Sequence, residues 1–330
     1  MKKKIFHILN STGLSSLLRL QKKGMLTVLS LHRISNETDF FWDPVKPADF
    51  EKLLQYLVIH YSIISFSDIQ RIQPSTQNSK PYLILSFDDG YYDFYEHALP
   101  LLVKYKLPCN HNIVNECASS NMVIWTQKLN NLFTHCRNIN NTGITFGDDG
   151  LLLDYRNSGN NWMKFYLKTY HYLISLPLMQ RLAIITEKER QLSVNTDVRM
   201  MNWQQIKECT QYKVEIGCHT YSHDVLSTIH DRDVLFHEIV EASRETGKQL
   251  EKPIEILALP NGQGNELVNE MAALAGLKHV LYVGDKINPL QKYTNGAGIN
   301  DTYRVNLVQE SMPEMILRAE MFHAKMRRYA

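Results

Sequence analysis

Short apolar runs recur along the chain with amphipathic segments between them. The runs are almost continuously apolar, which is typical of strands covered on both faces. The intervening segments, such as residues 49–61, 92–106 and 233–250, carry apolar residues at helical spacing with polar residues opposite. This alternation predicts a parallel sheet, either open or closed into a barrel. The predicted strands span residues 25–32, 82–87, 109–114, 214–218, 254–260 and 279–284.

The alternation breaks between about residues 116 and 201, where helical segments, an Asn-rich patch and a possible hairpin replace it. It resumes at residue 202, so we expect a mostly helical insertion at about 116–201 within one domain spanning 25–330. A single α/β barrel can reach the chain's length of 330 residues. Two separate domains are the alternative.

The composition and net charge indicate which partners and which compartment to expect. The chain is 44% hydrophobic and 21% charged, as in ordinary globular proteins, and its net charge of +2 gives no electrostatic reason to expect a nucleic-acid partner. Its five cysteines form no CxxC pair, and their odd number argues against a disulfide framework. A reducing compartment is the simpler expectation.

Residues 1–24 start with a basic cluster, but polar residues interrupt the apolar run that follows, and no small-residue cleavage site is evident. We therefore expect a cytoplasmic location and not secretion. The segment can form an amphipathic helix, which predicts either peripheral contact with an anionic membrane or packing against its own domain.

Asp88 and Asp89 follow the apolar run of LILSFDDG and precede Gly90. Carboxylates at the end of a buried strand reach the carboxyl edge of the sheet, where α/β folds bind ligands. Neighbouring strand residues face opposite ways, so a bend at Gly90 is needed for both to line one site. A solvated turn, with Asp93 as a helix N-cap, is the alternative.

His219 and His223 follow another predicted strand, in GCHTYSHDVLS. Their spacing of four lets two imidazoles converge on one ion, and neutral imidazole suits zinc or a similar transition metal. Two ordinary surface histidines are the alternative. Because the aspartates and the histidines both follow buried strands, we expect them at the same rim of one sheet.

Two further strand ends contribute candidates. Asn261 lies in a Pro-Asn-Gly turn after the run 254–260, where outward backbone N–H groups can stabilise an oxyanion. His32 ends the first run and is a candidate acid. A second Asp-Asp-Gly triplet at 148–150 follows no buried run and is interpreted as a hairpin turn.

Together, SFDDG, HTYSH and LPNG resemble, in order, three motifs of the polysaccharide deacetylase, or NodB-homology, family. LSLHR resembles an N-terminal strand motif of a subgroup. The resemblance covers about residues 25–115 and 200–310. It implies a distorted barrel of about seven strands and helices, of the (β/α)7 type.

The resemblance also implies roles for individual residues. Asp89, His219 and His223 would hold a divalent metal, which we expect to be zinc, with cobalt, nickel or manganese as alternatives. Asp88 would be the general base, and Asn261 would help hold the oxyanion.

The chain departs from the family's motifs at two points, which concern the arginine that orients the base and the acid. Ala258 stands where an arginine that orients the base often begins the third motif. A late Leu-x-His motif, which supplies the acid, has no convincing match, and His32 is the candidate in its place.

The implied function is removal of N-acetyl groups from a carbohydrate, such as a glycan or a lipid-linked precursor, in cell-envelope polysaccharide metabolism. One alternative is a saccharide-binding protein that has lost turnover on the same scaffold. The other is hydrolysis of a non-sugar amide, because nothing in the motifs recognises a sugar.

Overall fold

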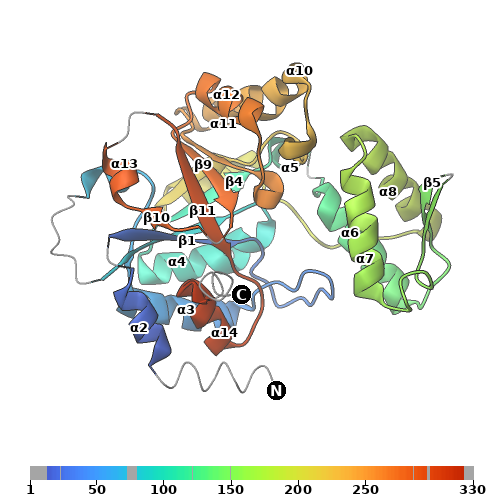
Figure 1. Ribbon diagram of the computed structural model, residues 1–330, viewed down its shortest axis with the longest axis horizontal. Helices are drawn as coiled ribbons and strands as arrows, with labels where there is room; N and C mark the ends of the chain where they lie inside the picture. The colour runs from blue at the N-terminus through green and yellow to red at the C-terminus, as the bar shows by residue number, and fades with distance from the viewer. Residues whose placement is uncertain are drawn as a thin grey trace. The chain divides into compact units, whose positions relative to one another are not determined.

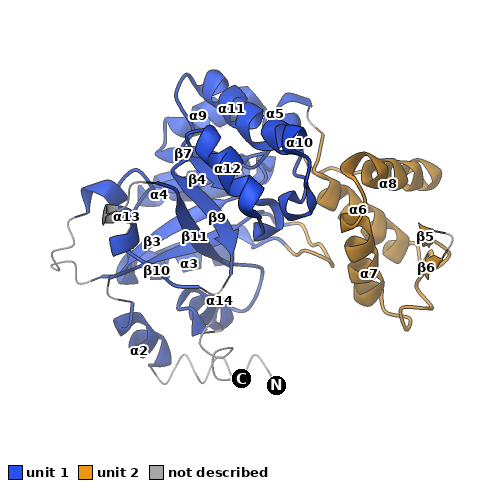
Figure 2. Ribbon diagram, turned by 45° about the horizontal axis from the view of Figure 1, so that its top comes forward, with its two compact units in different colours: residues 1–36, 44–121, 200–330 blue, residues 37–43, 122–199 orange. Residues whose placement is uncertain are grey.

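The computed structural model describes residues 13–22, 24–72, 80–120, 122–148, 150–284, 286–295 and 298–322. The chain forms two compact units (Figure 2). Unit 1 comprises residues 1–36, 44–121 and 200–330, and unit 2 comprises residues 37–43 and 122–199.

A closed barrel of parallel strands forms the centre of unit 1 (Figure 1). The strands follow one another around it in the order β1-β11-β9-β8-β7-β4-β3, and a six-residue parallel pairing between β3 and β1 closes it. The predicted α/β barrel is confirmed. Its strands are β1 (Met25–Leu31), β3 (Tyr82–Phe87), β4 (Cys109–Ile113), β7 (Val214–Cys218), β8 (Ile256–Ala258), β9 (His279–Val283) and β11 (Asn300–Asn306).

The barrel is distorted at the seam between β3 and β4. These strands pair only at Ser86 with Asn110 and at Phe87 with His111. The short strand β2 (Ser62–Ile63) takes up the pairing at the start of β3. Beyond the barrel, β10 (Asn288–Pro289) pairs antiparallel with the start of β1.

Both faces of the barrel wall are buried, as the apolar runs predicted. Val28 and Ile84 belong to an apolar cluster that also contains Ile256 and Leu281. Their neighbours Leu29 and Leu85 belong to a different cluster, with helix α3. Successive strand residues alternate between the two faces. The α-helices of unit 1 are α2 (Leu14–Leu20), α3 (Pro47–His60), α4 (Leu99–Tyr105), α5 (Asn115–Ser120), α9 (Trp203–Thr210), α10 (Arg232–Leu235), α11 (Ala242–Leu250), α12 (Glu266–Leu274), α13 (Gln291–Asn295) and α14 (Met312–Ala319). There are also short 3-10 helices, η1 (Ile69–Arg71), η3 (Leu226–Thr228) and η5 (Pro260–Gly262), and π-helical segments, η2 (Phe94–Ala98) and η4 (Phe236–Glu241).

Strand β11 is the barrel strand that the apolar pattern missed. Its sequence, NDTYRVN, has polar residues at every second position, from Asn300 to Asn306, instead of running continuously apolar. Thr302 and Arg304 are fully buried on one face, while Tyr303 stacks on Tyr282 on the other. A strand with a polar inner face gives no continuous hydrophobic signal.

The described part of residues 1–24 packs against its own domain. Leu18 of α2 is buried against Leu317, and Arg19 pairs with Glu320 at 3.0 Å. Leu17 and Leu20 stay exposed. Residues 1–12, which complete the predicted membrane-contacting segment, lie outside the described residues, so membrane contact stays a prediction. Among the described helices, none combines the length and apolarity that crossing a bilayer requires.

In its described residues, unit 2 contains three helices and a hairpin around an aromatic core. Phe41, from the segment 37–43, stacks on Tyr166 with ring centroids 4.7 Å apart, and both rings contact Phe133. The sequence pattern gave no sign that residues 37–43 join this unit. The elements are α6 (Trp125–Asn138), α7 (Trp162–Ile174), α8 (Leu178–Leu192), β5 (Phe146–Asp148) and β6 (Leu151–Leu153).

Candidate metal centre and active site

The two aspartates lie at the carboxyl end of β3. The backbone N–H of Asp88 donates to the carbonyl of Leu31, which extends the pairing with β1 by one residue. Asp89 then adopts a left-handed conformation with φ 77°, and Gly90 follows with φ 90°. The bend therefore starts one residue before the predicted position. Both aspartates are buried: 2% of the surface of Asp88 and 3% of the surface of Asp89 are exposed.

The two histidines lie at the carboxyl end of β7. His219 still pairs with the sheet through its backbone N–H, which donates to Ile113. The chain then curls through two left-handed residues, Thr220 (φ 68°) and His223 (φ 62°), and the His223 N–H donates to the Thr220 hydroxyl at 3.0 Å. Non-glycine residues in this region store strain, a common feature of functional sites.

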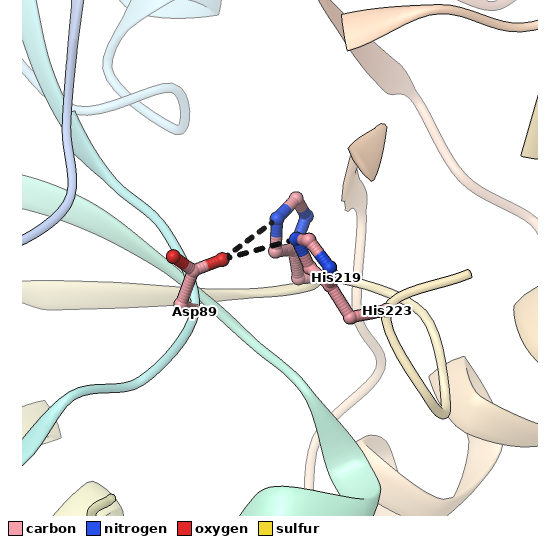
Figure 3. Close-up of side chains that lie close together, drawn as sticks. All are labelled: Asp89, His219 and His223. Atoms are coloured by element: carbon pink, nitrogen blue, oxygen red, sulfur yellow. Dashed lines mark ion pairs between the residues drawn. The ribbon is translucent and has the colours of Figure 1, made fainter. Parts of the chain in front are cut away.

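Asp89, His219 and His223 converge on one point (Figure 3). The Nε2 atoms of His219 and His223 lie 3.2 Å and 3.4 Å from Oδ1 of Asp89. Three potential ligand atoms, each from a buried residue, lie within 4.8 Å of one another. Strand-end placement thus brings together the residues that the motifs singled out.

This donor set fits a divalent cation. The Nδ1 of His219 lies 2.8 Å from the carbonyl of Ala258, and a carbonyl only accepts, so Nδ1 carries a proton and Nε2 is the ring atom left to bind a cation. Two ligands of a tetrahedral zinc ion, each about 2.0–2.1 Å from it, lie roughly 3.3–3.4 Å apart. The separations of the two Nε2 atoms from Oδ1 of Asp89, 3.2 Å and 3.4 Å, are close to that spacing.

The electrostatics point the same way. Burial by itself lowers the pKa of His219, but the carboxylates of Asp88 and Asp89 outweigh burial and raise it above its ordinary value. Burial raises the pKa of Asp89, yet the close imidazoles of His219 and His223 hold it well below its ordinary value. The point between these side chains therefore favours positive charge.

Asp88 has different partners from Asp89. Its Oδ1 accepts from Nη1 of Arg304 at 2.7 Å and from Nδ2 of Asn112 at 2.8 Å. Burial raises the pKa of Asp88, but Arg304 and His219 outweigh burial and hold it below its ordinary value. Asp88 is therefore a carboxylate at neutral pH.

The sequence did not identify Arg304 or Asn112. Ala258 stands where the third motif often carries the orienting arginine, but a different arginine reaches Asp88 from β11, a strand that the apolar pattern missed. The available signals were weak: an arginine among β-forming residues in TYRVN, and polar residues alternating in CNHNI.

His32, the candidate acid, lies near Asp88. Its Nε2 is 4.0 Å from Oδ2 of Asp88, and its side chain keeps 20% of its surface exposed. Burial lowers the pKa of His32, and Asp89 and Asp88 offset this only in part. The structure places His32 at the site, and its role as the acid stays a prediction.

Asn261 lies in the turn after β8. Its φ of 57° puts it at the left-handed position of a tight turn that the Gly262 N–H closes on the Leu259 carbonyl at 2.8 Å. The same strand supplies the Ala258 carbonyl that orients His219. Asn261 thus follows a barrel strand that contacts the candidate centre, and its role as an oxyanion donor stays a prediction.

A model of the polysaccharide deacetylase family matches residues 176–280, which include both histidines and Asn261. No curated protein sequence matches the chain. Among solved structures, the deacetylase PplD of Streptococcus pyogenes, in complex with acetate, is similar over 90% of this chain and 98% of that chain, with 17% identity and a TM-score of 0.56.

Two further solved structures are similar to this chain. IcaB from Ammonifex degensii is similar over 90% of this chain and 97% of that chain, with 17% identity and a TM-score of 0.57. BC0361, a polysaccharide deacetylase from Bacillus cereus, is similar over 90% of this chain and 69% of that chain, with 14% identity and a TM-score of 0.53. The resemblance to the polysaccharide deacetylases is therefore confirmed, by the family model over residues 176–280 and by the fold of the barrel.

Proposed function

We propose that this protein is a divalent-metal-dependent N-deacetylase that acts on an N-acetylated saccharide. The observation that carries the proposal is the buried cluster of Asp89, His219 and His223, with Oδ1 of Asp89 3.2 Å and 3.4 Å from the two Nε2 atoms. It lies beside a second carboxylate, Asp88, which is ionised and is not part of the cluster. One carboxylate and two imidazoles leave coordination positions open, as catalytic sites do.

These three side chains would hold the metal. Two nitrogens and one oxygen suit zinc, and cobalt, nickel or manganese are alternatives with the same ligands. A divalent cation bound there supplies Lewis acidity toward an amide carbonyl and toward water.

The remaining residues would handle protons and charge. Asp88 accepts a proton from the attacking water through Oδ2, because its Oδ1 is occupied by Arg304 and Asn112. His32, whose Nε2 lies 4.0 Å from that oxygen, receives this proton and passes it to the leaving amine. The backbone N–H of Asn261 stabilises the oxyanion. Acetate and an amino sugar leave.

The saccharide part of the proposal draws on the relatives. BC0361 is named a polysaccharide deacetylase, and PplD was solved with acetate. By analogy, the substrate would be an N-acetylated glycan or lipid-linked precursor of cell-envelope polysaccharide. Peripheral contact with a membrane through residues 1–24 would suit a lipid-linked substrate.

Acetate release from N-acetylglucosamine oligosaccharides, with zinc and with chelator, tests this function. We expect zinc-dependent release, and a loss of at least about 10³-fold in Asp88→Asn with zinc retained, because an amide accepts no proton at neutral pH. Near-wild-type activity in Asp88→Asn would refute the mechanism.

The two alternatives give different results in the same assay. Saccharide binding without acetate release in the zinc-loaded wild type would identify a binding protein. Release of acetate from simple acetanilides but not from oligosaccharides would identify a non-sugar amidohydrolase.

A further inference from the structure

The interior of the barrel changes from apolar to polar toward the candidate site. Val28 and Ile84 lie in the interior apolar cluster, but two residues further along their strands come the buried Ser30 and Ser86, and then Asp88 on β3. Arg304 enters this polar layer from β11 with none of its side-chain surface exposed. The Arg304 side chain brings a full positive charge into this layer.

Arg304 fixes one specific oxygen of Asp88. Its Nη1 lies 2.7 Å from Oδ1 of Asp88 and 3.2 Å from the Ser86 hydroxyl. Asn112 donates to the same Oδ1 at 2.8 Å, and its Nδ2 also lies 3.1 Å from the Phe87 carbonyl. Two donors from two different strands therefore converge on Oδ1, while Oδ2 faces His32.

The ion pair of Arg304 and Asp88 leaves nearby buried polar atoms without hydrogen bonds, which is unfavourable for a pair with only a structural role. The Nε and Nη2 of Arg304 are buried and have no hydrogen-bond partner among the described residues, and the same holds for Oδ1 of Asn112. A buried guanidinium with unmade hydrogen bonds costs stability, and apolar residues of similar volume often replace such pairs without loss. A costly ion pair of this kind is expected where the orientation of Asp88 is needed for function.

We propose that Arg304 is the positioning residue of Asp88. With Asn112 it holds Oδ1, so that Oδ2 is the oxygen aimed at the substrate and free to take a proton. This role rests on the proposed deacetylase function for its effect on turnover, but not for its effect on the orientation of Asp88. Arg304 acts through Asp88 and contacts none of the three candidate metal ligands in the described hydrogen bonds and ion pairs.

The test uses Arg304→Ala and Arg304→Met in the zinc-loaded full chain, with kcat, KM and zinc content measured for each. We expect zinc content as in the wild type, KM within about 3-fold, and kcat lowered by roughly 10²-fold in Arg304→Ala, because loss of orientation affects the transition state more than binding. Added guanidinium should restore kcat by about 10-fold or more in Arg304→Ala, because it can refill the vacated space.

Arg19→Ala is the matched control, because Arg19 also pairs with a buried carboxylate, Glu320, but on α2. We expect guanidinium to leave its kcat unchanged. If Arg304→Ala does not fold, Arg304→Met decides, because Met fills much of the same space but brings no charge and no donor to Oδ1 of Asp88. A kcat within about 3-fold of wild type in the folded variant, or loss of zinc together with activity, would overturn the proposal.

A crystal structure of the zinc-loaded variant separates this proposal from the deacetylase function. We expect the Asp88 carboxylate to turn by more than about 30°, away from its present rotamer, while Asp89 stays in place. An unmoved Asp88 refutes the positioning role even if the wild type releases no acetate. A turned Asp88 supports it, and a wild type without acetate release then counts against the proposed function alone.

Discussion

Arg304 and Asp88 are 216 positions apart in the chain, yet Nη1 of one lies 2.7 Å from Oδ1 of the other inside the barrel. The contact joins β11 to the end of β3 across the intervening strand β1. It separates the roles of the two adjacent aspartates. Asp88 is tied to Arg304 and Asn112, whereas Asp89 faces His219 and His223.

Removing a candidate ligand should abolish metal binding. We expect zinc at 100 times its dissociation constant to stabilise the wild type by about 2.7 kcal/mol, and to leave His219→Ala unchanged. His219→Ala loses one of three donors and the imidazole that Ala258 orients. Thermal unfolding with zinc and with chelator, together with zinc content by elemental analysis, measures both effects.

His237→Ala is the control for that comparison, because His237 is an exposed histidine that pairs with Glu241 on its own helix. It should keep the full zinc-dependent shift. A zinc-dependent shift of wild-type size in His219→Ala would contradict the assignment of the centre.

His32→Gln should affect substrates according to their leaving groups. If His32 protonates the leaving amine, kcat on an N-acetylated oligosaccharide should fall about 10²-fold, with zinc content unchanged. Hydrolysis of 4-nitrophenyl acetate should change by less than about 3-fold, because nitrophenolate leaves without a proton. Equal losses on both substrates would show that His32 has another role.

A buried histidine at the barrel wall, His279, should make the protein sensitive to acid. Burial lowers the pKa of His279 from 6.5 to about 4, and its ring lies between Phe66 and Tyr293. Between these two pH values only the unfolded state binds the proton, so stability falls as pH falls. This one group should cost roughly 2–3 kcal/mol by pH 4.5, and His279→Phe should remove that part of the slope.

Urea unfolding at pH 7, 5.5 and 4.5, with chelator present, measures the slope. His230→Phe, at an exposed histidine, should leave it unchanged. Parallel pH profiles for the wild type and His279→Phe would be the contrary result.

The Pro-Asn-Gly turn should depend on glycine at position 262. A Cβ there would lie 2.4 Å from the backbone N of Val283, and φ is +66°. Gly276 has a similar φ of +74° but nothing within 4 Å of its Cβ position, so it isolates the conformational cost. We expect Gly276→Ala to cost about 1 kcal/mol, and Gly262→Ala at least about 2 kcal/mol more from the clash.

Unfolding free energies of the two alanine variants test this difference. Because the turn carries Asn261, Gly262→Ala should also lower kcat if the Asn261 N–H stabilises the oxyanion, whereas Gly276→Ala should not. Equal stabilities for the two variants would mean that the turn relaxes around the added methyl group.

The sequence alone determined the barrel and the residues of the candidate centre. Continuous apolar runs identify strands buried on both faces, and parallel strands end at one rim, so Asp88, Asp89, His219 and His223 had to come close together. The motif order added the expectation of a deacetylase. These inferences succeed because each depends on residues that are close together in sequence.

Only the tertiary structure determined what surrounds Asp88. Arg304 and Asn112 lie on inner barrel positions whose polar side chains weaken the hydrophobic signal of their strands. Residues 37–43 join unit 2, whose other residues begin at 122, through the stacking of Phe41 on Tyr166. Contacts between residues this distant depend on how the closed barrel and the aromatic core bring strands and loops together, and local patterns do not encode that arrangement.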